Sequence, residues 1–341
     1  MGVVAHYDVA SHVPLEGSIS FVDLAGQLSM DVERLTRVLR CTIAHNIFEE
    51  SPPGSVRHTD FSLVLRERGA RAWLSHHAEE MLPASAKLID FMETYPKTES
   101  SKETAMSLAF PPHDRPKGYW EILEKEPWKV QRFSDGLEYA TATGGNHDFR
   151  ELVKVFDWKK FGAGTLVDVG GSSGRVCVAI APLAPELKFI VQDLPEVEEA
   201  AAKAIPEELK GRVRFEAHDF FKPQPVVDAH VYLYRQILHD WPDREAIAIL
   251  QALAPSLRNG DTVLLMEAVI PDPGQLPPHV ERLVRSADLL MMAKHNSKER
   301  TLEMWKQLLM AADERFVVKN VTVNERCPEA GSLIEVQWVE A

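Results

Sequence analysis

The stretch VDVGGSSG, residues 167–174, decides the fold of this chain. It completes a short run of β-branched and apolar residues, 165–169, which is typical of a strand buried in a parallel sheet. The glycines that follow permit a tight turn and let a ligand approach the backbone closely. Open α/β sheets bind their ligands at the carboxyl ends of the strands. The stretch therefore predicts the first strand of an α/β sheet with a binding site at its end.

The spacing of these glycines differs from the dinucleotide-binding pattern G-x-G-x-x-G. Two residues before Gly171 stands Val169, where that pattern requires a glycine. This weakens a nicotinamide-binding interpretation. Considered alone, the stretch is also compatible with a glycine turn that binds nothing.

The alternation of strands and helices extends from this point to the end of the chain. Apolar runs at 189–191, 213–215, 229–234 and 262–266 predict four more strands with helices between them, one of which we expect to run from a cap at Asp243 to Gly260. Such alternation is typical of a doubly wound parallel sheet. Residues 316–323 and 333–339 predict two final strands, which should pair antiparallel because the loop between them is too short for a crossover helix.

The first 100 residues follow a different pattern. Two amphipathic helices, the first capped by Ser20, precede a predicted hairpin at 47–49 and 56–59. Two helices and a short hairpin are typical of a winged helix, which binds DNA or joins subunits. This segment carries 9 Lys and Arg against 14 Asp and Glu, and duplex binding requires a cationic face. We therefore predict a dimerisation domain at 1–100, a helical connection at 101–161 and an α/β domain at 162–341.

The composition restricts the classes of function and partner. The net charge is −13 and 45% of the residues are apolar, which favours a globular protein that does not bind nucleic acid. Cys41, Cys177 and Cys327 are widely spaced, so we expect no metal site and a reducing compartment. The first residues lack the apolar core of a signal peptide, and no run of about 18 apolar residues predicts a membrane span. We expect a cytoplasmic protein.

Carboxylates follow the second and third predicted strands. Asp193 lies about twenty residues beyond the glycine turn, the distance at which a carboxylate accepts hydrogen bonds from a ribose diol. Asp219 and Phe220 follow the third strand and suit the amine and the face of a purine. A solvent-facing helix cap is the alternative for Asp193, and acidic residues are common at strand ends, which applies to Asp219.

The segment RQILHDWPD, residues 235–243, follows the fourth strand and contains the candidate base. His239 titrates near neutral pH and can remove a proton from a substrate. Glu267, at the end of the fifth strand, and Glu299 could reach the same edge of the sheet. A carboxylate beside an imidazole orients it and stabilises its protonated form. A histidine at a strand end is more often structural, so this hypothesis depends on its neighbours.

Six motifs in order make the chain resemble the plant and fungal caffeate-type O-methyltransferases. They are DVGGSSG (168–174), QDLPEV (192–197), HDFF (218–221), ILHDWPD (237–243), LLMEAVIP (264–271) and NSKERT (296–301). The resemblance covers nearly the whole chain. It implies a Rossmann-like domain that binds S-adenosyl-L-methionine without a metal, and an N-terminal winged-helix domain that forms a homodimer. The N-terminus and the loop before residues 298–301 are shorter than is usual in that family.

The resemblance also implies a role for each matching position. Cofactor contacts fall on Asp168 and Gly170 at the methionine end, Asp193 at the ribose, Leu194, Asp219 and Phe220 at the adenine, and Arg235, with Leu137 and Thr141 in the same cleft. Plant members usually have Lys in place of Arg235. His239 would be the general base, flanked by Glu267 and Glu299.

The acceptor is expected to be a small molecule with a phenol or enol hydroxyl, whose low pKa suits an imidazole base. Residues that could line its pocket are Phe110, Trp120, Trp241, Met291, Met292, His295 and Asn296, although the aromatic residues and methionines could equally be ordinary core. Some fungal relatives keep the cofactor but catalyse dehydration or pericyclic rearrangement. Loss of the base would indicate that chemistry, and His239 is present here.

Overall fold

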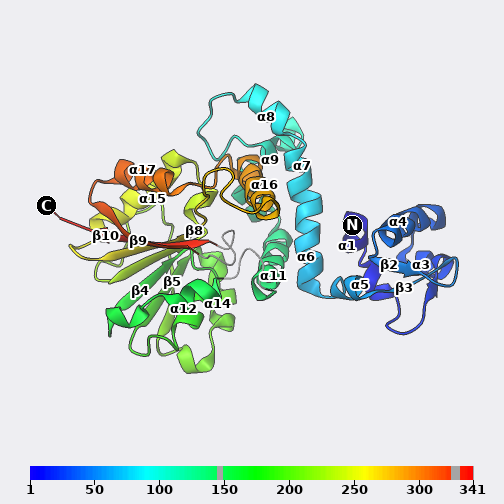
Figure 1. Ribbon diagram of the computed structural model, residues 1–341, viewed down its shortest axis with the longest axis horizontal. Helices are drawn as coiled ribbons and strands as arrows, with labels where there is room; N and C mark the ends of the chain where they lie inside the picture. Colours follow the sequence, from blue (N-terminus) through cyan, green and yellow to red (C-terminus); the bar gives the residue numbers. More distant parts are fainter. Residues whose placement is uncertain (144–148, 324–330, 341) are drawn as a thin grey trace. The chain divides into compact units, whose positions relative to one another are not determined.

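The computed structural model describes residues 1–143, 149–323 and 331–340 and divides the chain into two compact units (Figure 1). The first unit combines residues 1–89 with 106–145. The second combines residues 90–105 with 146–341. Cys327 lies outside the described residues. Among those residues, no helix has both the length and the apolar character needed to cross a bilayer.

A seven-stranded mixed sheet forms the centre of the second unit, in the order β6-β5-β4-β7-β8-β10-β9. The five strands β4 to β8 are parallel, and β10 and β9 run antiparallel to their neighbours. This confirms the predicted α/β sheet and its antiparallel end. The strands are β4 (Thr165–Val169), β5 (Lys188–Asp193), β6 (Val213–Ala217), β7 (Val231–Arg235), β8 (Thr262–Glu267), β9 (Phe316–Val323) and β10 (Ser332–Trp338).

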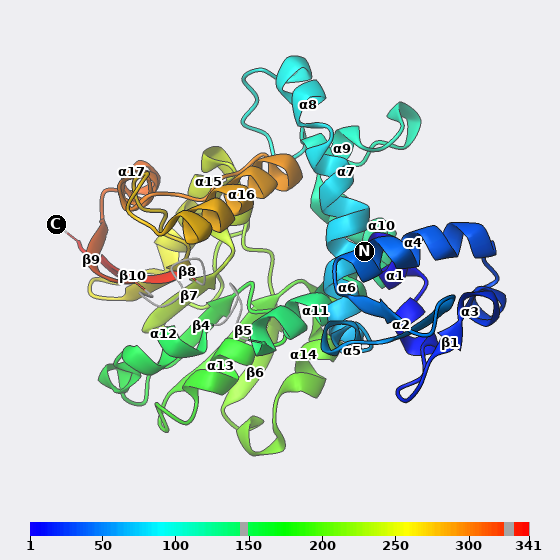
Figure 2. The same ribbon diagram turned by 45° about the vertical axis from the view of Figure 1, so that its right-hand side comes forward.

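Helices cover both faces of this sheet, as Figure 2 shows. One face carries α12 (Arg150–Val155), α13 (Arg175–Ile180) and α14 (Glu198–Ala204); the other carries α15 (Asp243–Leu253) and α17 (Leu302–Ala312). The longest helix of this unit is α16 (Pro278–His295). Short 3-10 turns are η3 (Trp158–Phe161), η4 (Pro195–Val197), η5 (Glu207–Leu209), η6 (Leu238–Asp240) and η7 (Ala254–Ser256).

Alternate residues of each strand pack on opposite faces of the sheet. Val167 belongs to the core that contains Leu250 of α15 and Trp305 of α17. The neighbouring Leu166 belongs to the core that contains Cys177 of α13. Both faces are therefore apolar, which explains why the strands appear in the sequence as continuous apolar runs.

The expected bounds of α15 were wrong at both ends. Its N-cap is Pro242, and the side chain of Asp243 makes no capping hydrogen bond but pairs with Arg300 and Lys298. The helix ends at Leu253, before the 3-10 turn that contains Pro255, and not at Gly260. Proline has no backbone N–H and disfavours helical geometry in the residue before it, so it ends the helix early.

The first unit contains a three-stranded antiparallel sheet, β1-β3-β2, and eleven helices or helical turns of the described residues lie wholly within it. Ser20 Oγ accepts a hydrogen bond from the Asp23 N–H at 3.0 Å, and β2 pairs with β3, so the predicted cap and hairpin are confirmed. The helices and strands between residues 2 and 142 are α1 (Gly2–His6), α2 (Val9–His12), β1 (Ile19–Ser20), α3 (Phe21–Leu28), α4 (Val32–Ala44), β2 (Phe48–Glu50), β3 (Ser55–His58), α5 (Asp60–Val64), α6 (Arg68–His76), the π-helix η1 (His77–Met81), α7 (Leu82–Ser85), α8 (Leu88–Thr94), α9 (Ala105–Leu108), η2 (Pro112–Asp114), α10 (Tyr119–Lys125) and α11 (Pro127–Ala142). Of these, α8 and α9 each cross a boundary between the two units.

Candidate active site

The glycine turn brings the end of β4 against the two strands beside it. Gly170 has a φ of +71°, and a Cβ there would lie 2.5 Å from Ile237 Cδ1. The N–H of Ser172 donates to Asp193 Oδ2 at 2.9 Å. Only glycine fits Gly170, because it needs both a left-handed φ and the missing side chain. The turn thus leaves exposed backbone at the carboxyl end of the sheet.

Asp168 lies under this turn with only 1% of its surface exposed. Its Oδ2 accepts a hydrogen bond from the thiol of Cys177 at 3.4 Å. Burial raises the pKa of Asp168 to about 6, although Cys177 and Arg235 favour the charged form. The guanidinium of Arg235 lies 4.7 Å from the ring centre of Phe149. Without a ligand, burial makes the negative charge of Asp168 unfavourable. A cationic ligand at this edge would therefore stabilise the charged carboxylate.

Asp193, at the end of β5, is held by backbone donors. Its Oδ1 accepts from the Leu194 N–H at 2.8 Å, and its Oδ2 accepts from the N–H of Ser172. Burial raises its pKa above the usual range, against the effect of these two hydrogen bonds. Each carboxylate oxygen can accept a second hydrogen bond, so the group fits a ribose diol. Leu194 beside it is 48% exposed.

Three aromatic rings gather beyond β6. Asp219 accepts the N–H of Phe221 at 3.0 Å, which fixes the turn. Trp241 meets Phe220 with ring centres 5.9 Å apart and Phe221 with ring centres 4.7 Å apart, both edge to face. Phe221 was not singled out from the sequence, although it adjoins Phe220 in the HDFF motif. The rings offer apolar surface of the kind that a purine requires.

His239 lies in η6, directly after β7. Its Nδ1 is 2.9 Å from Glu299 Oε1, and its Nε2 is 3.6 Å from Asp240 Oδ1. Burial alone would lower the pKa of His239, but the carboxylates of Glu299, Asp240 and Glu267 outweigh burial and raise it to about 10. The structure thus brings the predicted base and both predicted acids into one cluster.

Glu267 supports the loop that carries His239. Its side chain is fully buried at the end of β8, and Oε1 accepts the N–H groups of Ile237 at 2.9 Å and Leu238 at 2.8 Å. Burial raises the pKa of Glu267 to about 7. Its Oε2, like Glu299 Oε2, is buried without a hydrogen-bond partner in the described part of the chain. These two oxygens are free to accept from a ligand.

Arg300 joins the His239 loop to the segment that carries Glu299. Its fully buried guanidinium donates to the backbone carbonyls of Leu238 and Trp241, at 2.9 Å each, and to Asp243 Oδ1. The N–H of Glu299 donates to Asp288 Oδ1 at 2.8 Å. The sequence did not single out Arg300 or Asp288, because a run such as KER is usually a solvated surface. Their buried contacts appear only when the segment folds against η6.

The residues predicted for the acceptor pocket fall in both units. His295 is 2% exposed at the end of α16, and its Nε2 lies 3.0 Å from Asp240 Oδ1. Asn296 has a left-handed φ of 56°, and its amide donates to the carbonyls of Thr98 and Ser100 at 3.2 Å each. Met291 and Met292 are partly buried on α16. Phe110 and Trp120 belong to the first unit, as do Leu137 and Thr141, which were predicted for the cofactor cleft.

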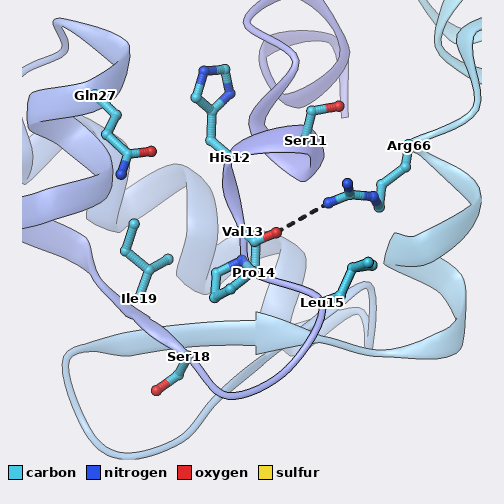
Figure 3. Close-up of a pocket in the computed structure, with 9 residues that line it drawn as sticks. All are labelled: Ser11, His12, Val13, Pro14, Leu15, Ser18, Ile19, Gln27 and Arg66. Carbon is cyan, nitrogen blue, oxygen red and sulfur yellow. Dashed lines mark hydrogen bonds between the residues drawn. The ribbon is translucent and has the colours of Figure 1, made fainter.

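A depression of about 350 Å³ in the first unit is separate from these residues (Figure 3). The guanidinium of Arg66 faces it but already donates to the carbonyls of Ala10 and Val13. Figure 3 shows the rest of the lining as His12, Gln27, two serines and four apolar residues. Nothing in this lining suits a particular chemistry. In the described ranges, no three His, Cys, Asp or Glu side chains are grouped so that they could hold a metal ion.

Comparison with known proteins identifies the class of the fold and the family. A model of the O-methyltransferase domain matches residues 113–313. The O-methyltransferase kk1A of Curvularia clavata is 37% identical over 319 residues, which is 93% of this chain and 74% of that protein. The sheet and its helices form the α/β methyltransferase fold. The chain belongs to the O-methyltransferase family and depends on S-adenosylmethionine.

Solved structures share this fold at lower sequence identity. NcsB1, an O-methyltransferase from neocarzinostatin biosynthesis in complex with S-adenosylmethionine and 2-hydroxy-5-methyl naphthoic acid, has a TM-score of 0.80 and 24% identity, covering 99% of this chain and 94% of its own. A pericyclic reaction enzyme has a TM-score of 0.79 and 22% identity, covering 98% and 84%. Both likenesses concern the fold alone.

Proposed function

We propose that this enzyme methylates a phenol or enol hydroxyl of a small molecule of secondary metabolism, with His239 as the general base. One observation carries the proposal: Nδ1 of His239 is fixed by Glu299 at 2.9 Å. This contact orients the ring and leaves Nε2 as the nitrogen for proton transfer. The hydroxylated aromatic acid bound by NcsB1 supports an acceptor of this kind.

The residues at the sheet edge fit the cofactor. When bound, S-adenosylmethionine supplies an electrophilic methyl group on a positively charged sulfur. Gly170 lets the turn pack closely against Ile237, and Asp168 offers a buried carboxylate under this turn for the methionine end. Asp193 retains acceptor capacity for the ribose, while Asp219 and Phe220 suit the adenine. Arg235 completes this set through its charge, facing Asp168.

His239 does the acid–base work in this proposal. Its raised pKa means that the ring carries a proton at neutral pH, and a sulfonium nearby makes that proton easier to lose. The neutral ring takes the hydroxyl proton at Nε2 while the acceptor oxygen bonds to the methyl carbon and the carbon–sulfur bond breaks. Glu299 stabilises the imidazolium that results, and Glu267 holds the loop in place.

Methyl uptake from labelled cofactor, measured over a panel of phenols and polyketides, tests this function. We expect His239→Asn to lower the rate about 10²–10⁴-fold while S-adenosylhomocysteine binds as in the wild type. The wild-type rate should rise with pH as His239 loses its proton, and the variant should lose this rise. His279→Asn, at an exposed position of α16, is the control and should change neither. Unaltered methylation and pH profile in His239→Asn would exclude His239 as the base.

The alternative is a pericyclase or dehydratase that binds the cofactor without transferring its methyl group. The fold likeness to a pericyclic reaction enzyme motivates it. The presence of His239 and its contact with Glu299 favour methyl transfer. A substrate that rearranges or loses water while the cofactor stays intact would establish the alternative.

We also propose the arrangement predicted from the sequence: a winged-helix-like dimerisation domain at 1–100, a connection that contributes to the acceptor pocket at 101–161, and a cofactor-binding domain at 162–341. Exposed apolar side chains in the first range, such as Leu82 at 67% and Ile89 at 71%, support a homodimer. The thiols of Cys41 and Cys177 are free, which suits the reducing cytoplasm.

A further inference from the structure

Asp240 lies between two imidazole rings. The same oxygen, Oδ1, is 3.0 Å from Nε2 of His295 and 3.6 Å from Nε2 of His239. His295 is 2% exposed, and the side chains of His239 and Asp240 are 13% exposed each. Water therefore screens these contacts poorly, and each strongly affects the others.

The position of Asp240 presents a difficulty for proton transfer. Nδ1 of His239 is occupied by Glu299, so Nε2 is the nitrogen that must receive the proton. A carboxylate that accepts a hydrogen bond from Nε2–H favours the protonated ring. With Glu299 on one nitrogen and Asp240 on the other, His239 would be held as an imidazolium. Such a ring would lose its proton only at still higher pH, and a smaller fraction of it would be neutral and able to act as a base.

His295 competes with His239 for Asp240. Burial, which outweighs the attraction of Asp240, lowers the pKa of His295 to about 4, so the ring is neutral at pH 7. A neutral imidazole carries one N–H, and the short contact at Nε2 assigns it to that nitrogen. Nε2 of His295 lies 3.0 Å from Asp240 Oδ1, 0.6 Å closer than Nε2 of His239, so the ring of His295 is the nearer polar neighbour of this carboxylate.

The end of α16 holds His295 in this position. The next residue, Asn296, ends the helix in a left-handed conformation and is tied to the carbonyls of Thr98 and Ser100. Rotation of the ring is limited by its burial at 2% exposure. The ring of His295 is therefore fixed from the helix end, next to the carboxylate of Asp240.

The charges around the pair come from several elements. Asp240 itself belongs to η6, Glu267 to the end of β8, and Glu299 to the segment after α16, and all three act on His239. Lys294 and His295 of α16 act on Asp240 and hold its pKa well below the usual range, against the effect of burial. Asp240 is thus ionised throughout the working range, and its distance from Nε2 decides its effect on His239.

We propose that His295 is a positioning residue, which holds the carboxylate of Asp240 off Nε2 of His239 and so lets that ring exchange its proton. The inference rests on the proposed role of His239. It assigns His295 to the base and not to the acceptor pocket. It also gives a function to the aspartate of the HDW motif: Asp240 follows the base in sequence and must be kept away from Nε2 of His239.

The test uses the full chain with His295→Leu and His295→Gln, each in the wild-type and the Asp240→Asn background. Leucine fills the buried site without a donor, whereas glutamine places an amide N–H near the position of Nε2. The readouts are the 15N titration of His239, assigned by its loss in His239→Asn, and the pH dependence of methyl transfer. The titration reports on His239 whether or not an acceptor is known.

We expect His295→Leu to move the ionisation of His239 to higher pH by about one unit, the lower end of the effect of a charge that moves into contact. The rate below that pH should fall about tenfold, since one pKa unit is a tenfold change in the neutral fraction. His295→Gln should keep the wild-type ionisation. Asp240→Asn should lower it, and adding His295→Leu should then change nothing further.

Two results would overturn the proposal. One is an unchanged or lowered ionisation of His239 in folded His295→Leu. The other is an equal upward shift with and without Asp240, because His295 would then act by another route. Should His295→Leu fail to fold, Asp240→Asn alone decides: an unaltered ionisation of His239 refutes the idea. Failure to methylate any hydroxyl would refute the proposed function and leave these titrations valid.

Discussion

At the scale of single residues, burial gives the carboxylates that we assign to the cofactor site an unusual pH dependence. Burial raises the pKa of Asp168 from its ordinary value of 3.8 to about 6. A cation bound beside it favours the charged form, so binding releases a proton below about pH 6. Calorimetry with S-adenosylmethionine should show affinity level above pH 7 and about tenfold lower at pH 5.

The matched control for this prediction is Asp168→Asn, which keeps the shape and removes the titration. Its affinity for the cofactor should be lower at pH 7 and should depend less on pH, with the remaining slope due to Asp193 and Glu267, whose pKa values burial also raises. The same burial costs stability: the protonated form of Asp168 is favoured in the fold, so this destabilising effect is absent below pH 4 and complete above pH 6. An undiminished slope in Asp168→Asn would contradict the assignment.

Asp193 provides a second test at this scale. We expect S-adenosylhomocysteine at 100 times its Kd to stabilise the wild type by about 2.7 kcal/mol through mass action. Asp193→Ala should remove most of the accompanying rise in melting temperature, because the ribose would lose its acceptor. Asp193→Asn should retain part of it, since one oxygen can still accept the N–H of Ser172. Glu303→Gln, on α17, should leave the shift intact; a full shift in Asp193→Ala would remove Asp193 from the ribose site.

At the scale of elements, the contact between η6 and the segment before α17 depends on Arg300. Arg300→Met leaves the carbonyls of Leu238 and Trp241 without their donor. An unsatisfied buried group costs about 1–3 kcal/mol, and we expect a loss of this order in the free energy of unfolding in denaturant titrations. Methyl transfer should fall as well, because Leu238 and Trp241 lose the donor that fixes the loop of His239. Arg300→Lys should be only a partial rescue, since an ammonium group cannot span both carbonyls.

Lys298 offers the matched control for Arg300, because it pairs with the same carboxylate, Asp243. Its side chain is 40% exposed, and exposed ion pairs contribute about 0–1 kcal/mol. Lys298→Met should therefore leave both stability and rate nearly unchanged. Equal losses in the two variants would show that stability depends on positive charge near Asp243 and that the hydrogen bonds from Arg300 to Leu238 and Trp241 contribute nothing.

The same scale shows how far the sequence predicts the structure. All seven strands of the large sheet were predicted. Those in its centre are buried on both faces and are runs of apolar residues such as 165–169. The bounds of α15 were not, because Asp243 resembles a cap and is engaged by Arg300 instead. The ion pair with the buried Arg300 prevents Asp243 from acting as the cap. A contact between residues so far apart in the chain cannot be predicted from a single sequence.

The candidate site was predictable to a similar extent. The residues at strand ends, from Asp168 to Glu267, converge because parallel strands share one carboxyl edge. Glu299 comes from a loop, so the strand pattern suggested only that it could reach the edge of His239, and the resemblance to a family assigned it beside the base. The contact of His295 with Asp240 joins two positions 55 residues apart, and neither spacing nor periodicity predicts such a pair.

At the scale of the whole molecule, we expect a homodimer formed through residues 1–100. Light scattering should give twice the chain mass of 38.3 kDa at micromolar concentration. Ile89→Lys combined with Leu82→Lys should yield monomers, because a charge on an apolar interface leaves it unpaired and dehydrated. Met310→Lys, at a position 71% exposed on α17, is the control and should remain dimeric. A wild-type monomer would contradict the prediction.

The interleaving of the two units has a consequence for how the chain is made. Residues 90–105 leave the ribosome before any strand of the large sheet, yet their partners, Glu245 and Asn296, are synthesised much later. This segment therefore cannot form its hydrogen bonds with Glu245 and Asn296 until most of the chain has been translated. A shortened gene that starts at residue 146 would encode the sheet without that segment, so the catalytic unit cannot be obtained intact by cutting the chain once.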